Sequence, residues 1–335
     1  MTKIAVIGAT GAVGRTMVSI LGQRRFPCSA IRLAASAKSA GRVATTHLGD
    51  AVVEDLSGMD PNGIDIALFS AGGDRSREHA RRFSEAGAVV IDNSSAFRMD
   101  DDVPLVVVGV NDGAASAHHG IIANPNCTTM TLMMAAGPLH EAAGLRSMVA
   151  TSYQSVSGSG QSGVDELLAQ SIPLGSDIEA LMRGGWVDPG PSLYERPIAF
   201  NVLPKAGSDV DGGYTDEEIK LVNESRKILG IPHLEVEPTC VRVPVLVGHG
   251  VAATLRFDRE VSRDEAISIL GSAPGVEVWK DRTPTPLDSA GIDEVLVGRI
   301  RETTSTPRGI NLWCVGDNLR KGAALNAVQI AELLL

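Results

Sequence analysis

Short apolar runs separated by charged or amphipathic segments dominate the first 127 residues of the chain. Compact runs rich in Val, Ile and Ala are typical of strands that are buried on both faces of a parallel sheet. We expect such strands at residues 4–7, 31–35, 52–56, 64–69, 88–91 and 103–110. Between some of these strands the sequence predicts helices, at residues 12–23 and 74–85. Strands that alternate with helices predict a doubly wound α/β sheet.

The pattern changes after residue 143, where alternating apolar and polar positions become common. Alternation predicts strands with one buried and one open face, which suits an antiparallel sheet. We expect strands at residues 145–156, 239–243, 250–257, 295–301 and 309–315, and helices at residues 161–170, 215–229 and 263–270. A last helical pattern, at 319–335, is expected to return to the first domain. The prediction is therefore a nucleotide-binding domain of residues 1–127 with 315–335, and an α+β domain with a mostly antiparallel sheet at residues 128–314.

A glycine-rich turn follows the first expected strand and leads directly into the first expected helix. Gly8 permits the turn, Gly11 lets the backbone approach a pyrophosphate, and Gly14 lets the helix pack on the strand. In this position the pattern indicates a Rossmann-like dinucleotide-binding domain, and a simple tight turn is the less favoured alternative. The cofactor contacts expected here are Gly8, Thr10, Gly11, Ala12, Val13 and Gly14.

The end of the second expected strand indicates which dinucleotide binds. An NAD site usually has a carboxylate there, which bonds the ribose 2′-hydroxyl. This chain instead has Ser36, Lys38 and Ser39, whose hydroxyls and positive charge suit a 2′-phosphate. NADP(H) is therefore the expected cofactor, with a solvated polar loop as the alternative. Turns after later strands add Ala71, Gly72 and Ser94 to the expected cofactor site.

Composition excludes several classes of protein. Of the 335 residues, 44% are hydrophobic and 21% are charged, which suits a globular protein of two domains. A formal net charge of −10 without a strongly basic stretch argues against nucleic acid as a partner. We expect no signal peptide and no membrane span, because the chain begins directly with a strand and no apolar run is long enough. Four widely spaced cysteines predict neither a metal site nor disulfides, so a cytoplasmic location is expected.

Residues 124–129, which read NPNCTT, carry the strongest candidate for chemistry. A short apolar segment precedes them and a helical segment rich in Met, Leu and Ala follows, so Cys127 is expected at a helix N-terminus. The backbone N–H groups and the helix dipole favour the thiolate there, and a thiolate is a good nucleophile. The alternative is a buried cysteine that packs as a small hydrophobic side chain, but its polar neighbours argue against it.

Six segments together resemble those of a known family. They read GATGAVG at residues 8–14, DNSSAFR at 92–98, NPNCTT at 124–129, YQSVSG at 153–158, CVRVPVLVGHG at 240–250 and GDNLRKGAA at 316–324. Over nearly its whole length the chain resembles the aspartate-β-semialdehyde dehydrogenase family, in its shorter bacterial branch. The resemblance implies that NADPH reduces L-aspartyl-4-phosphate to L-aspartate-4-semialdehyde, with release of phosphate and through a thioester on Cys127.

The resemblance also implies roles for individual residues. His249 would be the general acid/base, since the ordinary pKa of histidine lies near the working pH, and Gln154 would orient the substrate or the intermediate. Arg242 would bind the substrate α-carboxylate, with a structural ion pair as the alternative. The other expected substrate contacts are Arg98 and Lys220 at the phosphate, Glu217 or Glu218 at the ammonium group, and Asn126. Ser157, Gly158, Gly160 and Asn318 would complete the cofactor site.

Three other functions compete with this one. An N-acetyl-γ-glutamyl-phosphate reductase has the same architecture, but Asn126 and the two threonines after Cys127 argue against it. A non-catalytic NADP-binding sensor would need none of the residues named for chemistry. A glyceraldehyde-phosphate dehydrogenase is disfavoured by the missing acidic residue after the second strand. By resemblance we expect a homodimer, with a homotetramer as an alternative. The loop at residues 184–197, rich in Gly and Pro, is a candidate interface.

Overall fold

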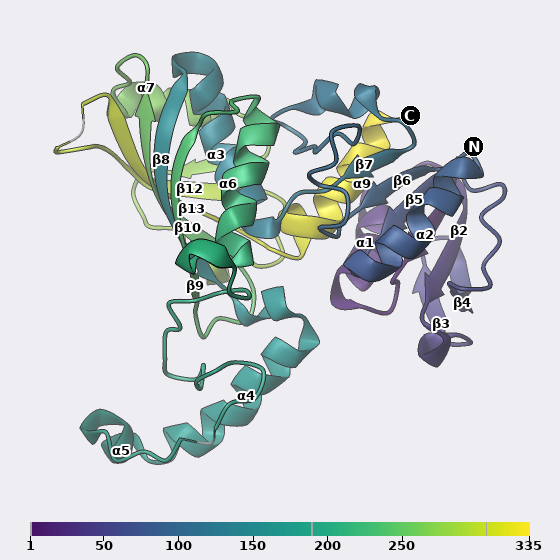
Figure 1. The fold of residues 1–335 in the computed structure, drawn as a ribbon, viewed down its shortest axis with the longest axis horizontal. Coiled ribbons are helices and arrows are strands. Elements are labelled where there is room, and N and C mark those ends of the chain that lie inside the picture. Colours follow the sequence, from purple (N-terminus) through teal and green to yellow (C-terminus); the bar gives the residue numbers. More distant parts are fainter. Residues whose placement is uncertain (1, 189, 306) are drawn as a thin grey trace. The chain divides into compact units, whose positions relative to one another are not determined.

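The computed structural model describes residues 2–188, 190–305 and 307–335. Their contacts form two compact units, each with a sheet of its own (Figure 1). Unit 1 comprises Met1–Gly137, Asn223–His233 and Leu319–Leu335, and unit 2 comprises Pro138–Val222 and Leu234–Asn318. Unit 1 therefore extends to residue 137, beyond the boundary expected at 127, and it includes part of a helix that was expected in the second domain.

The sheet of unit 1 has seven strands in the order β3-β4-β2-β1-β5-β6-β7. All neighbouring strands are parallel except β3 and β4, which confirms the predicted doubly wound sheet. Continuous apolar runs such as β5 are buried throughout, as strands in the middle of such a sheet must be. The strands are β1 Thr2–Ile7, β2 Cys28–Ala35, β3 Val43–Thr46, β4 Gly49–Asp55, β5 Ile66–Phe69, β6 Val89–Asp92 and β7 Ile121–Ala123.

The prediction of a strand at residues 103–110 is wrong. Only Leu105 forms a bridge, to Ala123, and the chain then turns. Pro104 cannot donate to a ladder, and Gly109 has a φ of 93°, so the run cannot continue as a strand. Most of its apolar side chains, including Val106, are nevertheless buried, which explains why the pattern resembled a strand.

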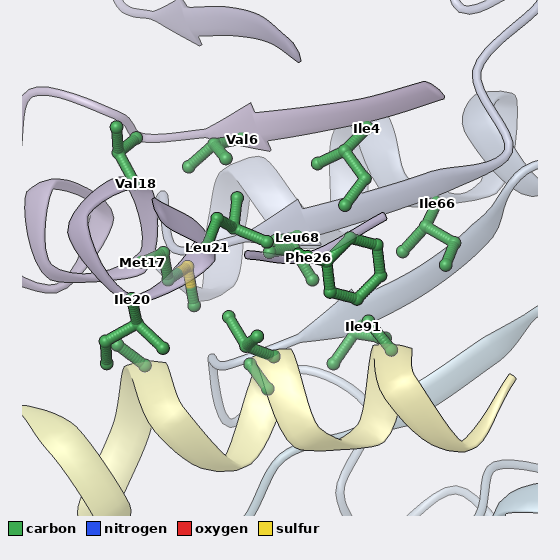
Figure 2. Packing of buried hydrophobic residues seen from close by; sticks show 14 of the residues in the cluster. Ile4, Val6, Met17, Val18, Ile20, Leu21, Phe26, Ile66, Leu68 and Ile91 are labelled. Atoms are coloured by element: carbon green, nitrogen blue, oxygen red, sulfur yellow. The ribbon is translucent and has the colours of Figure 1, made fainter. Parts of the chain in front are cut away.

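The core of unit 1 joins the two ends of the chain. Side chains of α1 (Ala12–Gln23) and of the central strands pack against α9 (Leu325–Leu333), the yellow helix in Figure 2. The C-terminal segment thus returns to the nucleotide-binding unit, as predicted, although it enters α9 through a π-helical turn at Arg320–Ala324. The other helices assigned wholly or partly to this unit are α2 (Gly73–Glu85), α3 (Cys127–Ala143) and α6 (Asp216–Leu229).

The sheet of unit 2 has six strands in the order β11-β12-β13-β10-β8-β9. Three of its five pairings are antiparallel, so the predicted α+β domain with a mostly antiparallel sheet is confirmed. The strands are β8 Leu145–Gln154, β9 Glu235–Arg242, β10 His249–Phe257, β11 Val276–Trp279, β12 Val295–Glu302 and β13 Gly309–Gly316, and the remaining helices are α4 Gln161–Gly175, α5 Ile178–Arg183, α7 Arg263–Gly271 and α8 Pro286–Ser289. Across the described ranges, no helix has the length and apolar character needed to cross a bilayer.

Candidate active site

Cys127 is the first residue of α3, where the sequence pattern predicted it. Its side chain is partly exposed, whereas the chain's three other cysteines are buried. The side-chain oxygen of Asn126 accepts the backbone N–H groups of Thr128 and Thr129, at 2.9 and 3.4 Å, and so caps the helix. A capped helix N-terminus with an accessible thiol is a setting that favours a nucleophilic thiolate.

Two buried side chains hold the turn that precedes Cys127. Arg98 donates from Nε to the carbonyl oxygen of Asn124, at 2.9 Å, and from Nη1 to Glu224 Oε1, at 2.9 Å. The other carboxylate oxygen of Glu224 accepts the backbone N–H of Asn126, at 2.7 Å. With a further bond to the Asn93 carbonyl, at least three of the five N–H groups of Arg98 are engaged inside the protein. The phosphate-binding role of Arg98 therefore stays a prediction, beside a structural role that the contacts display.

The glycine-rich turn after β1 has the shape that a dinucleotide requires. Gly8 has a φ of 83°, and a Cβ at Gly8 would collide with the carbonyl oxygen of Ser70. A Cβ at Gly14 would likewise collide with the carbonyl of Gly8. Gly11 and Gly72 are the N-cap residues of α1 and α2, and neither supplies a capping side chain. Two helix N-termini thus begin in bare backbone, which fits the binding of a pyrophosphate.

The loop after β2 adjoins this turn and has no carboxylate at its start. β2 ends at Ala35, and Ser36 precedes a short 3-10 helix, Ala37–Ser39. The hydroxyl oxygens of Thr10 and Ser39 are 3.4 Å apart, so the two predicted cofactor segments lie side by side. Lys38 is exposed. These residues fit an adenosine ribose with a 2′-phosphate.

Ser94 has an internal partner. Its hydroxyl donates to Asp92 Oδ2 at 2.6 Å, and it accepts the backbone N–H of Ala96 at 3.1 Å. Burial raises the pKa of the Asp92 carboxyl, although hydrogen bonds from Ser76 and Ser94 oppose this. Ser94 therefore shapes the loop after β6, and the predicted contact of Ser94 with the cofactor stays a prediction. No group of three or more His, Cys, Asp or Glu that could hold a metal occurs in the described parts of the chain.

Three of the predicted residues of unit 2 lie at one edge of its sheet. Gln154 ends β8, Arg242 ends β9, and His249 begins β10. β8 and β9 are parallel with Gln154 opposite Arg242, whereas β10 runs antiparallel to β8 with Gly250 opposite Tyr153. The topology alone therefore gathers these side chains, although they are up to 95 positions apart in the sequence.

The imidazole of His249 is fully buried and neutral. Burial and, second, the positive charge of Arg242 together lower the pKa of His249 to about 3. In the protein alone the pKa of His249 therefore lies well below the ordinary histidine value on which its expected acid/base role was based. Nδ1 accepts the backbone N–H of Ser155 at 3.1 Å, which assigns the proton of the neutral ring to Nε2. Among the described residues Nε2 has no hydrogen-bond partner.

Arg242 lies beside His249 and is also incompletely bonded. Its Nη1 donates to the carbonyl oxygen of Ser155 at 2.8 Å, but its buried Nε has no partner in the part of the chain that the structure describes. A Cβ on Gly158 would lie 2.8 Å from Arg242 Nη1 and 3.1 Å from His249 Nε2, so only glycine leaves these two nitrogens room. Buried donors without acceptors are costly, and an anionic ligand would satisfy them.

The predicted residues of α6 form a second cluster in unit 2. Lys220 Nζ lies 2.9 Å from Glu217 Oε1 and 2.6 Å from Asp216 Oδ2. Burial by itself would lower the pKa of Lys220, but these two carboxylates outweigh it and raise the pKa, so Lys220 is a cation. Glu217 Oε2 is 3.5 Å from Gln154 Nε2, and this contact joins the cluster to the sheet edge.

Glu218 is a structural residue. Its two carboxylate oxygens accept the backbone N–H groups of Thr215, at 2.8 Å, and Cys240, at 2.9 Å. The first of these bonds and the bond from the Glu218 N–H to Thr215 Oγ1 form a capping box at the start of α6. Between the two adjacent glutamates, Glu217 is therefore the one whose carboxylate is directed toward Gln154.

Two residues that the sequence analysis missed connect the predicted ones. Ser155 bonds both His249 and Arg242, and its hydroxyl also lies 3.1 Å from Asn318 Oδ1. Asn318 in turn contacts Ser157 and the backbone N–H of Gly248, so it lies within the His249 cluster. The second missed residue is Glu224. Its position, one helical repeat of seven after Glu217 on the same face of α6, was a usable signal.

Comparisons with known proteins agree with this geometry. Residues 3–118 match the family model of the semialdehyde dehydrogenase NAD binding domain, and residues 137–321 match that of the semialdehyde dehydrogenase dimerisation domain. The chain is 51% identical to an aspartate-semialdehyde dehydrogenase of Mycolicibacterium smegmatis over 100% of this chain and 99% of the relative. It is 53% identical to that of Streptomyces akiyoshiensis, over 99% and 98% of the two chains.

The solved structures that match the chain are also aspartate semialdehyde dehydrogenases. A crystal structure of aspartate semialdehyde dehydrogenase II from Vibrio cholerae, complexed with ASA, matches with a TM-score of 0.93 and 42% identity, over 100% of this chain and 98% of the other. The enzyme from Candida albicans, with NADP, matches with a TM-score of 0.73 and 25% identity, over 100% and 98%.

Proposed function

The chain belongs to the aspartate-semialdehyde dehydrogenase family, and from this premise we propose that it reduces L-aspartyl-4-phosphate to L-aspartate-4-semialdehyde with NADPH. It is an enzyme of that family, an oxidoreductase of the aspartate pathway. The observation that carries the proposed mechanism is Cys127, the one partly exposed cysteine, at the capped N-terminus of α3.

In the proposed mechanism, the sulfur of Cys127 attacks the carbonyl carbon of the acyl phosphate. The S–C bond forms, the C–O bond to phosphate breaks, and phosphate leaves with the electron pair, so that a thioester remains. NADPH, when bound, would supply the hydride that reduces the thioester carbon; the C–S bond then breaks, the semialdehyde leaves, and the thiolate of Cys127 is regenerated. The N-terminus of α3 can hold the negative charge that develops on the carbonyl oxygen. His249 is the proposed general acid/base, and because its ring is neutral in the protein alone, this role requires that the bound anionic substrate raise its pKa.

Binding of the substrate is assigned to charged groups that are already positioned. Arg242 takes the α-carboxylate, which would satisfy its buried Nε. Glu217 takes the ammonium group, and Gln154 orients the substrate, which the contact between these two side chains supports. Lys220 and Arg98 take the phosphate, and Asn126 fixes the start of α3.

The cofactor is proposed to be NADP(H), held by bare backbone at its pyrophosphate and by hydroxyls and a cation at its 2′-phosphate. The collisions that a Cβ would cause at Gly8 and Gly14, and the absence of a carboxylate at the end of β2, support this choice. The proposed contacts in unit 1 are Gly8, Thr10, Gly11, Ala12, Val13, Gly14, Ser36, Lys38, Ser39, Ala71, Gly72 and Ser94. Those in unit 2 are Ser157, Gly158, Gly160 and Asn318.

A homodimer is proposed as the working assembly, with a homotetramer as the alternative. The match of residues 137–321 to a dimerisation domain supports it. One face of the six-stranded sheet is open, with Val149 53% and Tyr153 37% exposed, and Tyr153 contacts the ring of Trp313. Exposed apolar side chains also occur on α5 and in the following loop, where Met182 is 82% and Val187 83% exposed.

We also propose a cytoplasmic location, which suits cysteines that form no disulfide in the described structure.

The proposed reaction is tested in reverse, with L-aspartate semialdehyde, inorganic phosphate and NADP, by the absorbance of the NADPH formed. Parallel samples contain N-acetyl-glutamate semialdehyde, omit phosphate, or contain NAD in place of NADP. We expect rapid, phosphate-dependent formation of NADPH from the aspartate compound alone. Turnover of the acetylated compound would instead indicate the reductase of the acetylated pathway, and NADP binding without turnover of either compound would indicate a sensor.

A further inference from the structure

Glu224 is a buried carboxylate that faces two donors of the Cys127 region, and none of the roles above uses it. It is 1% exposed, on the part of α6 that belongs to unit 1. One oxygen accepts the guanidinium of Arg98 at 2.9 Å, and the other accepts the backbone N–H of Asn126, the residue before Cys127, at 2.7 Å. A buried carboxylate is retained only where such partners compensate its desolvation.

The bonds of Glu224 close a ring around the turn. Arg98, which Glu224 orients, bonds the carbonyl oxygen of Asn124 at 2.9 Å, so both ends of the Asn-Pro-Asn turn are held by one ion pair. One helical turn further along α6, Lys227 donates to the carbonyl oxygens of Arg98 and Asp100, at 2.8 and 2.7 Å. The same helix therefore fixes the loop that carries Arg98 and the start of the helix that carries the nucleophile.

Only an ionised carboxylate can accept from both donors. In a glutamine at position 224, one oxygen would remain as an acceptor and the other atom would become an NH₂ donor. The charged guanidinium is the stronger donor, so the amide oxygen would turn to Arg98, and the N–H of Asn126 would then face another donor. A shorter aspartate would keep the charge but would lose the reach to one of the two partners.

We infer that Glu224 is a positioning residue for the reaction, which holds the Asn-Pro-Asn turn so that Cys127 starts α3 in the attacking position. This inference rests on the proposed function of Cys127 as the nucleophile. Errors in the position of a reacting atom of about 1 Å cost on the order of 10²-fold in rate, so a loosened turn should lower kcat more than it changes substrate binding.

The test compares Glu224→Gln and Glu224→Asp with the native chain in the phosphate-dependent assay. Both variants are expected to lower kcat by about 10- to 100-fold, with the KM for the semialdehyde changed by less than about two-fold. A second readout, the pH dependence of alkylation of Cys127 by iodoacetamide, needs no substrate. Its midpoint should move to lower pH in Glu224→Gln, because a negative charge bonded to the backbone N–H of the residue before Cys127 is lost, and should stay at the native pH in Glu224→Asp.

Glu218→Gln is the matched control, because Glu218 is a buried glutamate of the same helix that also accepts two backbone N–H groups. It should leave the alkylation midpoint unchanged and lower kcat by less than either variant at 224. Native kcat in both Glu224 variants, or an equal loss of kcat in Glu218→Gln, would overturn the inference. If Glu224→Gln does not fold, the kcat of Glu224→Asp decides. If the native chain does not turn over the aspartate compound, the proposed substrate fails, but the alkylation midpoints still test Glu224.

Discussion

The two buried arginines of the predicted site, Arg98 in unit 1 and Arg242 in unit 2, have nearly equal exposure, at 7% and 6%, but different surroundings. Arg98 is paired with the carboxylate of Glu224 and bonds two backbone carbonyls. Arg242 bonds one carbonyl, forms no ion pair with a described residue, and keeps a buried Nε without a partner.

The difference separates two uses of a buried cation. An arginine whose charge is neutralised by a protein carboxylate contributes to the structure around it, and here that structure is the turn before Cys127. An arginine that is desolvated but not neutralised is costly to the fold alone, and its cost is recovered when an anion binds. In the proposed mechanism, the first region holds the nucleophile and the second receives the substrate.

Removal of the thiol tests the first half of this comparison and has the largest expected effect. If the Arg98 region exists to hold a nucleophile, Cys127→Ala should abolish turnover while NADPH still binds, because the thioester cannot form without the sulfur. Turnover is followed by absorbance and NADPH binding by fluorescence. Cys28→Ala, which removes a buried thiol of the same unit, should retain turnover. Substantial activity in Cys127→Ala would refute the covalent mechanism.

Substitution of each arginine by methionine tests the comparison directly. Arg98→Met leaves the Glu224 carboxylate buried without its cation and should lower the free energy of unfolding by about 3–5 kcal/mol. Arg242→Met removes one hydrogen bond, worth about 0.5–1.5 kcal/mol, and at the same time relieves an unneutralised charge, so its stability should stay close to native. Urea unfolding at neutral pH measures both variants.

The activity of Arg242→Met gives a second test of the comparison. Arg242→Met should bind NADPH normally but should have a much higher KM for the semialdehyde, because the α-carboxylate has lost its partner. Equal losses of stability in the two variants would show that Arg242 is in a structural ion pair after all, which was the alternative that the sequence left open.

Much of the fold followed from the sequence because local patterns determine it. The glycine turn at Gly8 and the helix start at Cys127 depend on neighbouring residues, and the structure has both where they were expected. The apolar run at 103–110 led to a wrong prediction of a strand, because a buried run does not form a strand where Pro104 and Gly109 interrupt the backbone pairing. The units also divide within α3 and α6, which no change in composition marks.

The candidate site was predicted less completely, because its partners are distant in the sequence. Cys127 could be found from its turn, but Gln154 and Arg242 meet only through the pairing of β8 with β9, and they were named by resemblance. Ser155 and Glu224 escaped notice because their important hydrogen bonds are to distant residues. Ser155 bonds a residue 94 positions away in the sequence, and Glu224 bonds one 98 positions away. The neutral state of His249 could not be predicted either, since it depends on how fully the fold buries the ring.

The last prediction concerns that neutral ring and is the smallest in energy. In the folded chain the pKa of His249 is about 3, below the value near 6.5 of an unfolded histidine, so the unfolded chain binds a proton that the folded chain does not. The resulting loss of stability begins as the pH falls below about 6.5 and amounts to about 1.4 kcal/mol for each pH unit until the folded pKa is reached. His249→Asn lacks this penalty. Between about pH 6.5 and pH 4.5 it should therefore lose about 2–3 kcal/mol less stability than the native chain in urea unfolding, whereas His233→Asn, at an exposed position, should follow the native curve. Identical pH dependence in the native chain and in His249→Asn would show that the ring has the same pKa in the folded and the unfolded chain, and that burial does not keep it neutral.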